Sequence, residues 1–281
     1  SLFVIVSLIS YSQENKSIKD YLEVLEKTGQ EPVKFVNNLL NDFDLLLFDD
    51  ALHLAKEPFD FYQELIMNNT FNSKVKYIFI EVFSTTSQPN VDKYFNSAIK
   101  DDTILLPVFQ NDYSGYGWRY KTYLDLLGTV WDVNSKLSES EKIQMICVNQ
   151  PIYWSAIQTR KDYDLFQQSL VGRDYFMYKI ISKSLANFKS GEKGIFLTNT
   201  RHAYKGIKKS NGGFYWNTGM SLAKLDVPQE LSIRLHNVAL SIQSKLDSIS
   251  KPSIEGLDRI SYNWIRMDNG LWDKAFKENG K

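Results

Sequence analysis

The sequence predicts an α/β fold in which a mostly parallel central sheet is flanked by helices. Four short apolar runs, at residues 45–48, 75–82, 143–148 and 194–200, have the composition of strands buried on both faces of a sheet. Segments with the spacing of amphipathic helices separate these runs, and strands that alternate with helices favour parallel pairing. The chain contains no repeat of 20–50 residues, so a repeat architecture is excluded.

The expected helices are placed by apolar side chains at helical spacing and by residues that favour helix ends. Proline is favoured in a first helical turn, which fits Pro32 and Pro58, and glycine favours a helix end, which fits Gly29. The helices expected on this basis are residues 17–27, a segment from Pro32, a segment from Glu57 and Pro58, residues 118–136, one long helix over 162–188, and residues 214–225.

The remaining segments are expected to be turns, loops or edge strands. Residues 88–90 have the composition of a turn before a short helix, and residues 101–117 mix Pro, Asn, Gly and aromatics as a loop or lid does. Residues 208–213 are expected to form a Lys/Gly-rich loop. Residues 231–243 alternate well enough to be a strand pair or an edge strand.

The composition is that of a globular protein and narrows the classes of partner. Hydrophobic residues make up 43% and charged residues 23% of the 281 residues, so disorder is not expected. The 33 basic and 33 acidic residues balance, which argues against a general nucleic-acid or anionic-membrane surface. Cys147 lies in an apolar run and is expected to be a buried hydrophobe. A single cysteine excludes an intrachain disulfide framework and a CxxC zinc site.

The first residues resemble an export signal. Residues 2–9 are apolar and are followed by Ser-Tyr-Ser-Gln, which resembles the hydrophobic and cleavage regions of a secretory signal peptide. The alternative is a first buried strand, because short apolar runs are ambiguous, and the run is too short to span a membrane. We expect residues 1–13 to be a signal-peptide remnant and residues 14–281 to form a single α/β domain. The protein is then extracytoplasmic, periplasmic or secreted, with no membrane span in the mature chain.

Polar side chains follow three of the four expected strands. In a parallel sheet the carboxyl ends of the strands lie at one edge, where α/β folds place ligand sites. Two of the three histidines fall at these ends, whereas His236 lies in the alternating segment and is expected to be structural. The chain has no GxGxxG after a strand, no Walker loop, no GxSxG and no HExxH. The polar residues at the strand ends are Asp49, Asp50, His53, Glu81, Asn199, Arg201 and His202.

Five segments in this order resemble the erythromycin esterase-like proteins, which belong to a superfamily with the Tiki proteases and the ChaN-type haem-binding proteins. They are DDALHLAKEPFDF, YIFIEV, VGRDYFMYKII, IFLTNTRHAYKG and NTGMSL, and they lie within residues 42–222. The family pattern is a strand followed by G-E-x-x-H, a strand that ends in Glu, an R-D-x-x-M helix and a strand that ends in H-N-x-H. The resemblance implies the same α/β core.

Matched residue by residue, the resemblance implies a site at the strand ends. Asp50 takes the place of the first motif's Glu and His53 that of its His, and Glu57 matches the acidic residue just after it. Glu81 matches the strand-end Glu, and His202 matches the last His of the final motif. Because the carboxyl ends of parallel strands lie at one edge of the sheet, these matched residues, about 150 apart in the sequence, are expected to converge there.

The R-D-x-x-M helix motif is present in this sequence, whereas other positions depart from the family pattern. Residues 173–177, with Arg173 and Asp174, match R-D-x-x-M. Asp49 stands at the Gly of the first motif, and Thr198 or Asn199, depending on the gap, stands at the first His of the last motif. These departures argue against macrolides as the substrate.

The function that the resemblance implies is a hydrolase that activates water to cleave an ester, a lactone or an amide. His53 is expected to be the general base, because its unperturbed pKa lies nearest neutrality, and Glu81 to hold its imidazole in one tautomer. His202 is expected to polarise a carbonyl or protonate a leaving group. Arg173 is expected to pair with Glu57 or Glu81, or to grip a substrate carboxylate. The expected supporting residues are Asp50, Glu57, Arg173, Asp174 and Arg201.

Two alternatives use nearly the same side chains. Asp50, His53, Glu81 and His202 offer the mixed imidazole and carboxylate ligands that suit zinc, manganese or iron, so the cofactor is either none or a divalent metal. The second alternative is a non-catalytic protein that binds a small molecule, haem or metal at a degenerate site. In each case the partner is a small molecule, and no nucleic acid is expected. A shared site requires the imidazoles of His53 and His202 to lie within roughly 10 Å of each other.

Overall fold

The structure is a computed structural model, in which residues 23, 26–50, 53, 56–111, 121–209, 211–225 and 229–235 are described. The chain divides into two compact units, residues 33–243 and residues 1–32 with 244–281. In the second unit, residue 23 and residues 26–28 are helical, in the region of the helix expected over 17–27 and one residue beyond its end. The predictions for residues 1–13 and for His236 lie outside the described residues, and a single domain over residues 14–281 stays a prediction.

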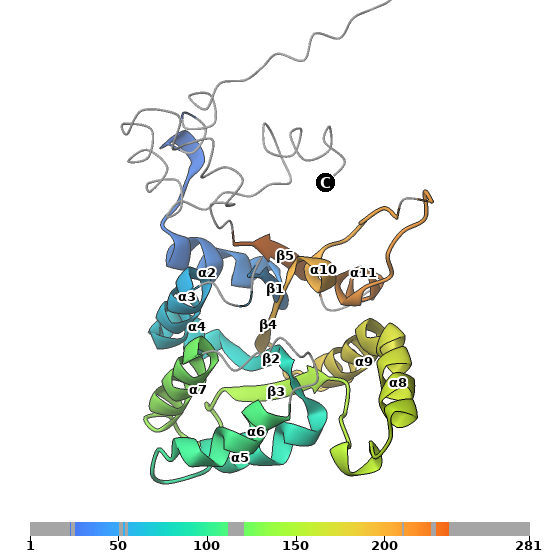
Figure 1. Ribbon diagram of the computed structural model, residues 1–281. Coiled ribbons are helices and arrows are strands. Elements are labelled where there is room, and N and C mark those ends of the chain that lie inside the picture. The colour runs from blue at the N-terminus through green and yellow to red at the C-terminus, as the bar shows by residue number, and fades with distance from the viewer. Residues whose placement is uncertain are drawn as a thin grey trace, which may run out of the picture. The chain divides into compact units, whose positions relative to one another are not determined.

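Five parallel strands form the central sheet, which confirms the predicted α/β fold (Figure 1). The strand order is β3-β2-β4-β1-β5, and every neighbouring pair is parallel. The four expected strands correspond to β1–β4, and the alternating segment supplies β5, a parallel edge strand beside β1. The strands are β1 (Leu45–Asp49), β2 (Val75–Ser84), β3 (Gln144–Asn149), β4 (Lys193–Thr198) and β5 (Glu230–Arg234).

Helices connect the strands and cover the sheet. In the described part of the chain, none of them is long and apolar enough to cross a bilayer. The α-helices are α2 (Pro32–Asp42), α3 (Lys56–Met67), α4 (Asn69–Lys74), α5 (Gln88–Phe95), α6 (Leu106–Gln110), α7 (Lys121–Asn134), α8 (Arg160–Ser169), α9 (Arg173–Leu185), α10 (Thr200–Ala203) and α11 (Thr218–Leu222). Short 3-10 turns are η1 (Thr85–Ser87), η2 (Asp102–Leu105), η3 (Trp154–Ala156) and η4 (Leu170–Gly172).

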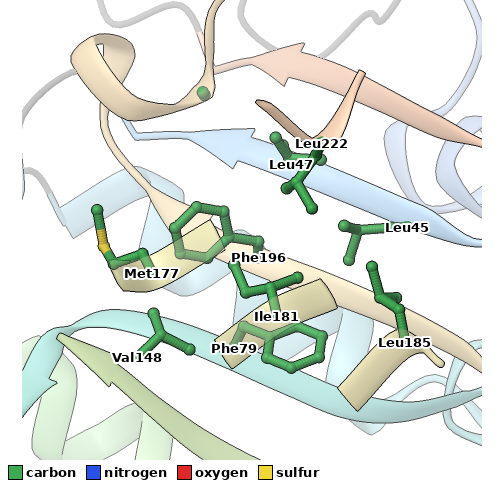
Figure 2. Close-up of a cluster of buried hydrophobic side chains, with 10 residues drawn as sticks. Leu45, Leu47, Phe79, Val148, Met177, Ile181, Leu185, Phe196 and Leu222 are labelled. Carbon is green, nitrogen blue, oxygen red and sulfur yellow. The ribbon is translucent and has the colours of Figure 1, made fainter. Parts of the chain in front are cut away.

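The packing of β1 explains why the apolar runs show no alternation. All five residues of this strand are buried. Leu45 and Leu47 belong to a cluster with Met177 of α9 (Figure 2), whereas Phe48 packs against Tyr62 of α3 with ring centroids 5.6 Å apart. Because helices cover both faces of the sheet, successive side chains of β1 are all buried. Each fully buried side chain of this size contributes about 1.5–3 kcal/mol to stability.

Two segments that the sequence predicted to be irregular are helical. Residues 88–90, expected as a turn, open α5, because Pro89 lies in the first turn, where its missing N–H costs no hydrogen bond. In the loop or lid expected over residues 101–117, η2 and α6 cover residues 102–110. Asp101 caps η2, since its carboxylate accepts a hydrogen bond from the Thr103 N–H at 3.0 Å. Residues 112–117 lie outside the described residues.

Two expected helices are interrupted or shorter. The long helix predicted over residues 162–188 is broken by η4, so that α9 begins at Arg173, and Gly172 at the break is a weak helix former. The helix predicted over residues 214–225 is limited to α11. Asn217 caps its first turn by accepting a hydrogen bond from the Met220 N–H at 2.8 Å. Both breaks matter for the site, because Arg173 and Thr218 open these two helices.

Gly219 lets α11 approach α10 more closely than a side chain would allow. A Cβ at this position would lie 2.2 Å from the carbonyl oxygen of Ala203 and 2.8 Å from its carbonyl carbon. We therefore expect Gly219→Ala to lower the free energy of unfolding by about 1–3 kcal/mol, measured by urea denaturation. Gly172→Ala is the matched control, because a Cβ there meets nothing within 4 Å. Equal stability of the two variants would contradict the close approach.

Candidate functional site

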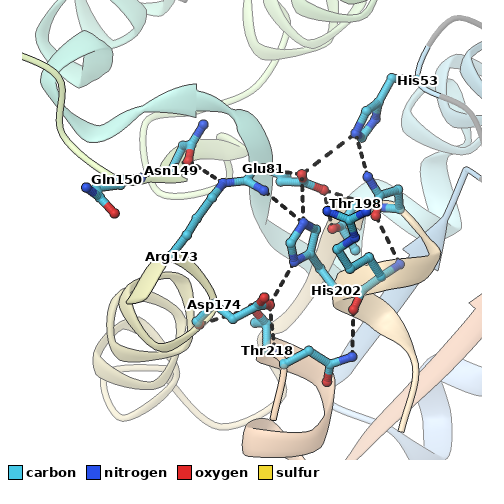
Figure 3. A network of polar contacts seen from close by, with 12 residues as sticks. His53, Glu81, Asn149, Gln150, Arg173, Asp174, Thr198, His202 and Thr218 are labelled. Carbon is cyan, nitrogen blue, oxygen red and sulfur yellow. Dashed lines mark hydrogen bonds and ion pairs between the residues drawn. The ribbon is translucent and has the colours of Figure 1, made fainter. Parts of the chain in front are cut away.

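Glu81 of β2 is the centre of a buried polar network at the carboxyl ends of the strands (Figure 3). Its Oε1 accepts a hydrogen bond from Arg173 Nη2 at 2.7 Å. Its Oε2 accepts hydrogen bonds from the Thr198 hydroxyl at 2.5 Å and from the Asn199 N–H at 3.2 Å. Burial opposes ionisation, but His202 and Arg173 outweigh it and hold the pKa of Glu81 well below its ordinary value. Glu81 is thus a fixed anion that organises the groups around it.

Arg173 ties three strand ends together from the first turn of α9. Its Nη2 donates to Glu81, its Nε donates to Asn149 Oδ1 at 2.8 Å, and its Nη1 lies 2.8 Å from His202 Nε2. Glu81 is one of the two partners that the sequence predicted for Arg173. Asn149 was missed, although it ends the third expected strand just as polar residues end the other three.

His202 and Asp174 form one imidazole–carboxylate pair. His202 Nδ1 lies 2.7 Å from Asp174 Oδ1, and that oxygen also accepts hydrogen bonds from the Thr218 N–H and hydroxyl, each at 2.8 Å. Burial acts against the charge of Asp174, but the hydrogen bond with His202 outweighs it and lowers the pKa of Asp174. Because a guanidinium can only donate, His202 Nε2 must accept from Arg173. We therefore assign the proton of this ring to Nδ1, facing Asp174.

His53 and Asp50 form a second pair of the same kind. His53 Nδ1 lies 2.9 Å from Asp50 Oδ2 and 3.1 Å from the Tyr123 hydroxyl, and His53 Nε2 lies 3.0 Å from Asn199 Nδ2. The Asn199 amide is oriented by the backbone, because its Oδ1 accepts from the Arg201 N–H at 3.0 Å. Its NH2 group therefore faces His53, and Nε2 accepts the hydrogen bond. When the ring of His53 is neutral, this arrangement therefore places its proton on Nδ1.

The electrostatic environment makes His53 a strong proton acceptor. Burial disfavours the charged ring, but the Glu81 carboxylate and the hydrogen bond with Asp50 outweigh it and raise the pKa of His53 to about 10. Burial also raises the pKa of Asp50 to about 6. The pKa of His53 thus lies above the unperturbed value of a histidine, because two carboxylates surround the ring.

Both imidazoles point at one carboxylate oxygen. His53 Nε2 lies 3.7 Å and His202 Nε2 3.3 Å from Glu81 Oε1. The two nitrogens are therefore no farther apart than the sum of these distances, well inside the roughly 10 Å that a shared site requires. Residues from β2, from the end of β4 and from the segment after β1 thus converge as the parallel topology predicts.

Two expected supporting residues do not enter this network through their side chains. Glu57 lies exposed in the first turn of α3. Arg201 is exposed in α10 and contributes through its backbone, because its N–H donates to Asn199 and its carbonyl oxygen accepts from Asn217. Among the described residues, neither side chain contacts Glu81 or the two histidines. The side chains that the sequence did not point to are Tyr123, Asn149 and Thr218. Thr198 and Asn199 were placed at the end of the fourth strand but were given no role in the site.

The guanidinium of Arg173 occupies the position between Glu81 and His202 where a metal ion would have to bind. The Arg173 guanidinium contacts Glu81 at 2.7 Å and His202 at 2.8 Å, and His53 Nδ1 faces Asp50. In the described ranges, no group of three or more His, Cys, Asp or Glu side chains is arranged to hold a metal ion. The residues suggested as ligands therefore do not fit a divalent metal in this arrangement.

Comparison with known proteins gives structural similarity without a sequence match. No protein-family model matches the chain. No curated protein matches it either. Similar solved structures include one described as bacterial protein toxins, at 14% identity and a TM-score of 0.48, covering 78% of this chain and 39% of that chain. The chain thus spans about two fifths of the length of that toxin structure.

Two further similar structures have names that describe a function. RRSP, a MARTX toxin effector domain from Vibrio vulnificus CMCP6, has 16% identity and a TM-score of 0.45, covering 78% of this chain and 38% of that chain. ChaN of Campylobacter jejuni, described with cofacial haem binding, has 14% identity and a TM-score of 0.44, covering 79% of this chain and 87% of that chain.

Proposed function

We propose that the protein is a hydrolase that activates water between His53 and His202 to cleave an ester, a lactone or an amide. One observation carries the proposal: two imidazoles, each held by an aspartate at Nδ1, place their Nε2 atoms 3.7 Å and 3.3 Å from the same buried carboxylate oxygen of Glu81. An imidazole oriented in this way by a carboxylate is the arrangement used for general-base catalysis.

His53 is the proposed general base. Water that replaces the Asn199 amide at Nε2 loses a proton to His53 as its oxygen attacks the substrate carbonyl carbon. The imidazolium formed in this step is stabilised by Asp50 and Glu81, the same carboxylates that raise the pKa of His53 to about 10. The leaving group then takes this proton as the acyl bond breaks, which restores the neutral ring and balances the reaction.

Arg173 and His202 are proposed to stabilise the negative charge that develops on the substrate's carbonyl oxygen during the attack. The guanidinium carries a permanent charge in a largely water-free site, where it stabilises negative charge that develops on the carbonyl oxygen more than it would in water. His202 fixes the guanidinium plane by accepting from Nη1 at 2.8 Å. The alternative is a non-catalytic small-molecule binder that uses the same polar network without turnover.

The test compares wild type with His53→Ala on a panel of esters, lactones and amides, each with and without a chelator. We expect wild-type turnover that the chelator does not change, and a loss of about 10²–10⁴-fold in His53→Ala, the usual contribution of a general base. Turnover that survives His53→Ala would overturn the assignment of the base. Loss of wild-type turnover with chelator would indicate a metal-bound water, and no wild-type turnover on any substrate would favour the binding alternative.

A further inference from the structure

A short hairpin between α10 and α11 extends away from these helices (Figure 1). Lys208 and Phe214 pair in antiparallel fashion, the Lys209 N–H donates to the Gly213 carbonyl at 2.6 Å, and the Tyr215 N–H donates to the Ile207 carbonyl at 2.8 Å. The hairpin is therefore held by its own backbone hydrogen bonds.

Three consecutive aromatic side chains of this hairpin are exposed. Phe214 is 46%, Tyr215 51% and Trp216 64% exposed. Successive side chains of a strand point to opposite faces, so Phe214 and Trp216 lie on one face of the hairpin and Tyr215 on the other. Large aromatic surface on both faces of a thin hairpin is unfavourable in water and calls for a partner that covers both faces.

Positive charge accompanies the aromatic side chains. Residues 201–216 contain four basic residues and no Asp or Glu, although the 33 basic and 33 acidic residues of the whole chain balance. Lys208 is exposed beside Phe214, and the Lys209 Nζ lies 5.1 Å from the ring centroid of Tyr215. Among the described residues, neither lysine forms an ion pair, whereas Lys205 is paired with Glu230 at 2.5 Å. Each face of the hairpin thus combines a lysine with an aromatic ring.

We propose that this hairpin binds the surface of an anionic lipid bilayer. Tyr and Trp are amphipathic and favour the headgroup region, the apolar ring of Phe214 inserts beside them, and Lys208 and Lys209 reach anionic headgroups. A bilayer interface surrounds an inserted hairpin and covers both of its faces, whereas a flat protein or nucleic-acid surface covers one. The balanced charge of the chain argues against a general basic surface, so the proposed binding rests on the hairpin alone.

The hairpin lies in the sequence between two residues of the polar network around Glu81. His202 precedes it and Thr218 follows it, and both contact Asp174. A membrane-bound hairpin therefore holds these two ends of the network near the lipid surface. The binding itself does not depend on the proposed hydrolysis, because it is measured without turnover.

The test is co-sedimentation of the full chain with vesicles of equimolar phosphatidylglycerol and phosphatidylcholine, and with vesicles of phosphatidylcholine alone. We expect wild type to bind the anionic vesicles and to lose binding as salt rises. The double variant Lys208→Glu/Lys209→Glu should bind at least about 25-fold more weakly, since each lysine near an anionic surface contributes about 5-fold. Phe214→Ser/Trp216→Ser should also weaken binding, with the salt dependence kept.

The matched control is Lys93→Glu/Lys136→Glu, which makes the same charge change at two exposed lysines, one in the last turn of α5 and one just after α7. It should bind like wild type, and circular dichroism checks that every variant is folded. The proposal is overturned if wild type does not bind anionic vesicles, or if the hairpin variants bind as the control does. Binding of a 20-nucleotide single-stranded DNA that depends on the hairpin, without vesicle binding, would assign the surface to nucleic acid and also overturn it.

Discussion

Replacing Arg173 by methionine is expected to lower the free energy of unfolding by about 3–5 kcal/mol at pH 7, the usual effect of removing one partner of a buried ion pair. The Arg173 side chain is 13% exposed and pairs with Glu81 at 2.7 Å. Its removal leaves the Glu81 carboxylate buried with only the Thr198 and Asn199 hydrogen bonds to Oε2 and the two imidazoles near Oε1. Urea denaturation of both proteins measures the difference.

The effect of Arg173→Met is expected to depend on pH. In wild type the pKa of Glu81 is held well below its ordinary value, so its contribution to stability is present above the unfolded pKa near 4.5 and is lost as pH falls through the lower folded pKa. Without the guanidinium, burial shifts the pKa of Glu81 upward. Protonation then relieves the unpaired charge, and the stability deficit of the variant should shrink as pH falls from 7 towards 4.5.

Arg160→Met is the matched control for this experiment. Arg160 pairs with Asp164 on the surface of α8, at 2.8 Å, and its side chain is 84% exposed. Exposed ion pairs contribute little, so the control should differ from wild type by less than about 1 kcal/mol at every pH. A deficit of Arg173→Met that stays constant from pH 7 to pH 4.5 would show that lost packing, and not the buried charge, dominates.

The second large effect concerns the two histidines together. His53→Gln and His202→Gln should each lower kcat/KM by about 10²–10⁴-fold on whichever substrate wild type cleaves. The double variant should lose little more than the more damaging single change, because residues that act on one reaction centre are not additive. Glu64→Gln, at an exposed position of α3, is the control and should leave kcat/KM unchanged.

The pH dependence of wild-type kcat/KM shows whether His53 acts as a general base or as a general acid. A general base must be neutral to accept a proton, and the pKa of His53 is raised to about 10. The rate should therefore rise with pH through the alkaline range. Asp50→Asn removes a hydrogen bond that raises this pKa, so the rise should move to lower pH. A rate that falls with increasing pH would instead indicate that His53 acts as an acid.

The apolar pattern alone was sufficient to predict strands β1 to β4. Residues 45–48 and 194–198 lack alternation because helices cover both faces of the sheet, and this physical requirement is visible in any buried parallel strand. The convergence of His53, Glu81 and His202 also follows from the parallel topology, which brings the carboxyl ends of strands to one edge. The breaks at Gly172 and before Thr218 were not predicted, since helical spacing continues across both.

The partners within the site were decided only by the tertiary structure. Arg173 pairs with Glu81 because α9 begins at Arg173, a boundary that apolar spacing does not fix. The proton position on His53 depends on the Asn199 amide, whose orientation is fixed by a backbone N–H two residues later in the chain. Such contacts depend on distances of about 3 Å between separate elements, and no local pattern of residues encodes them. The sequence by itself therefore determined the strands and the residues at their ends. The fold decided which of those residues meet and in which protonation state.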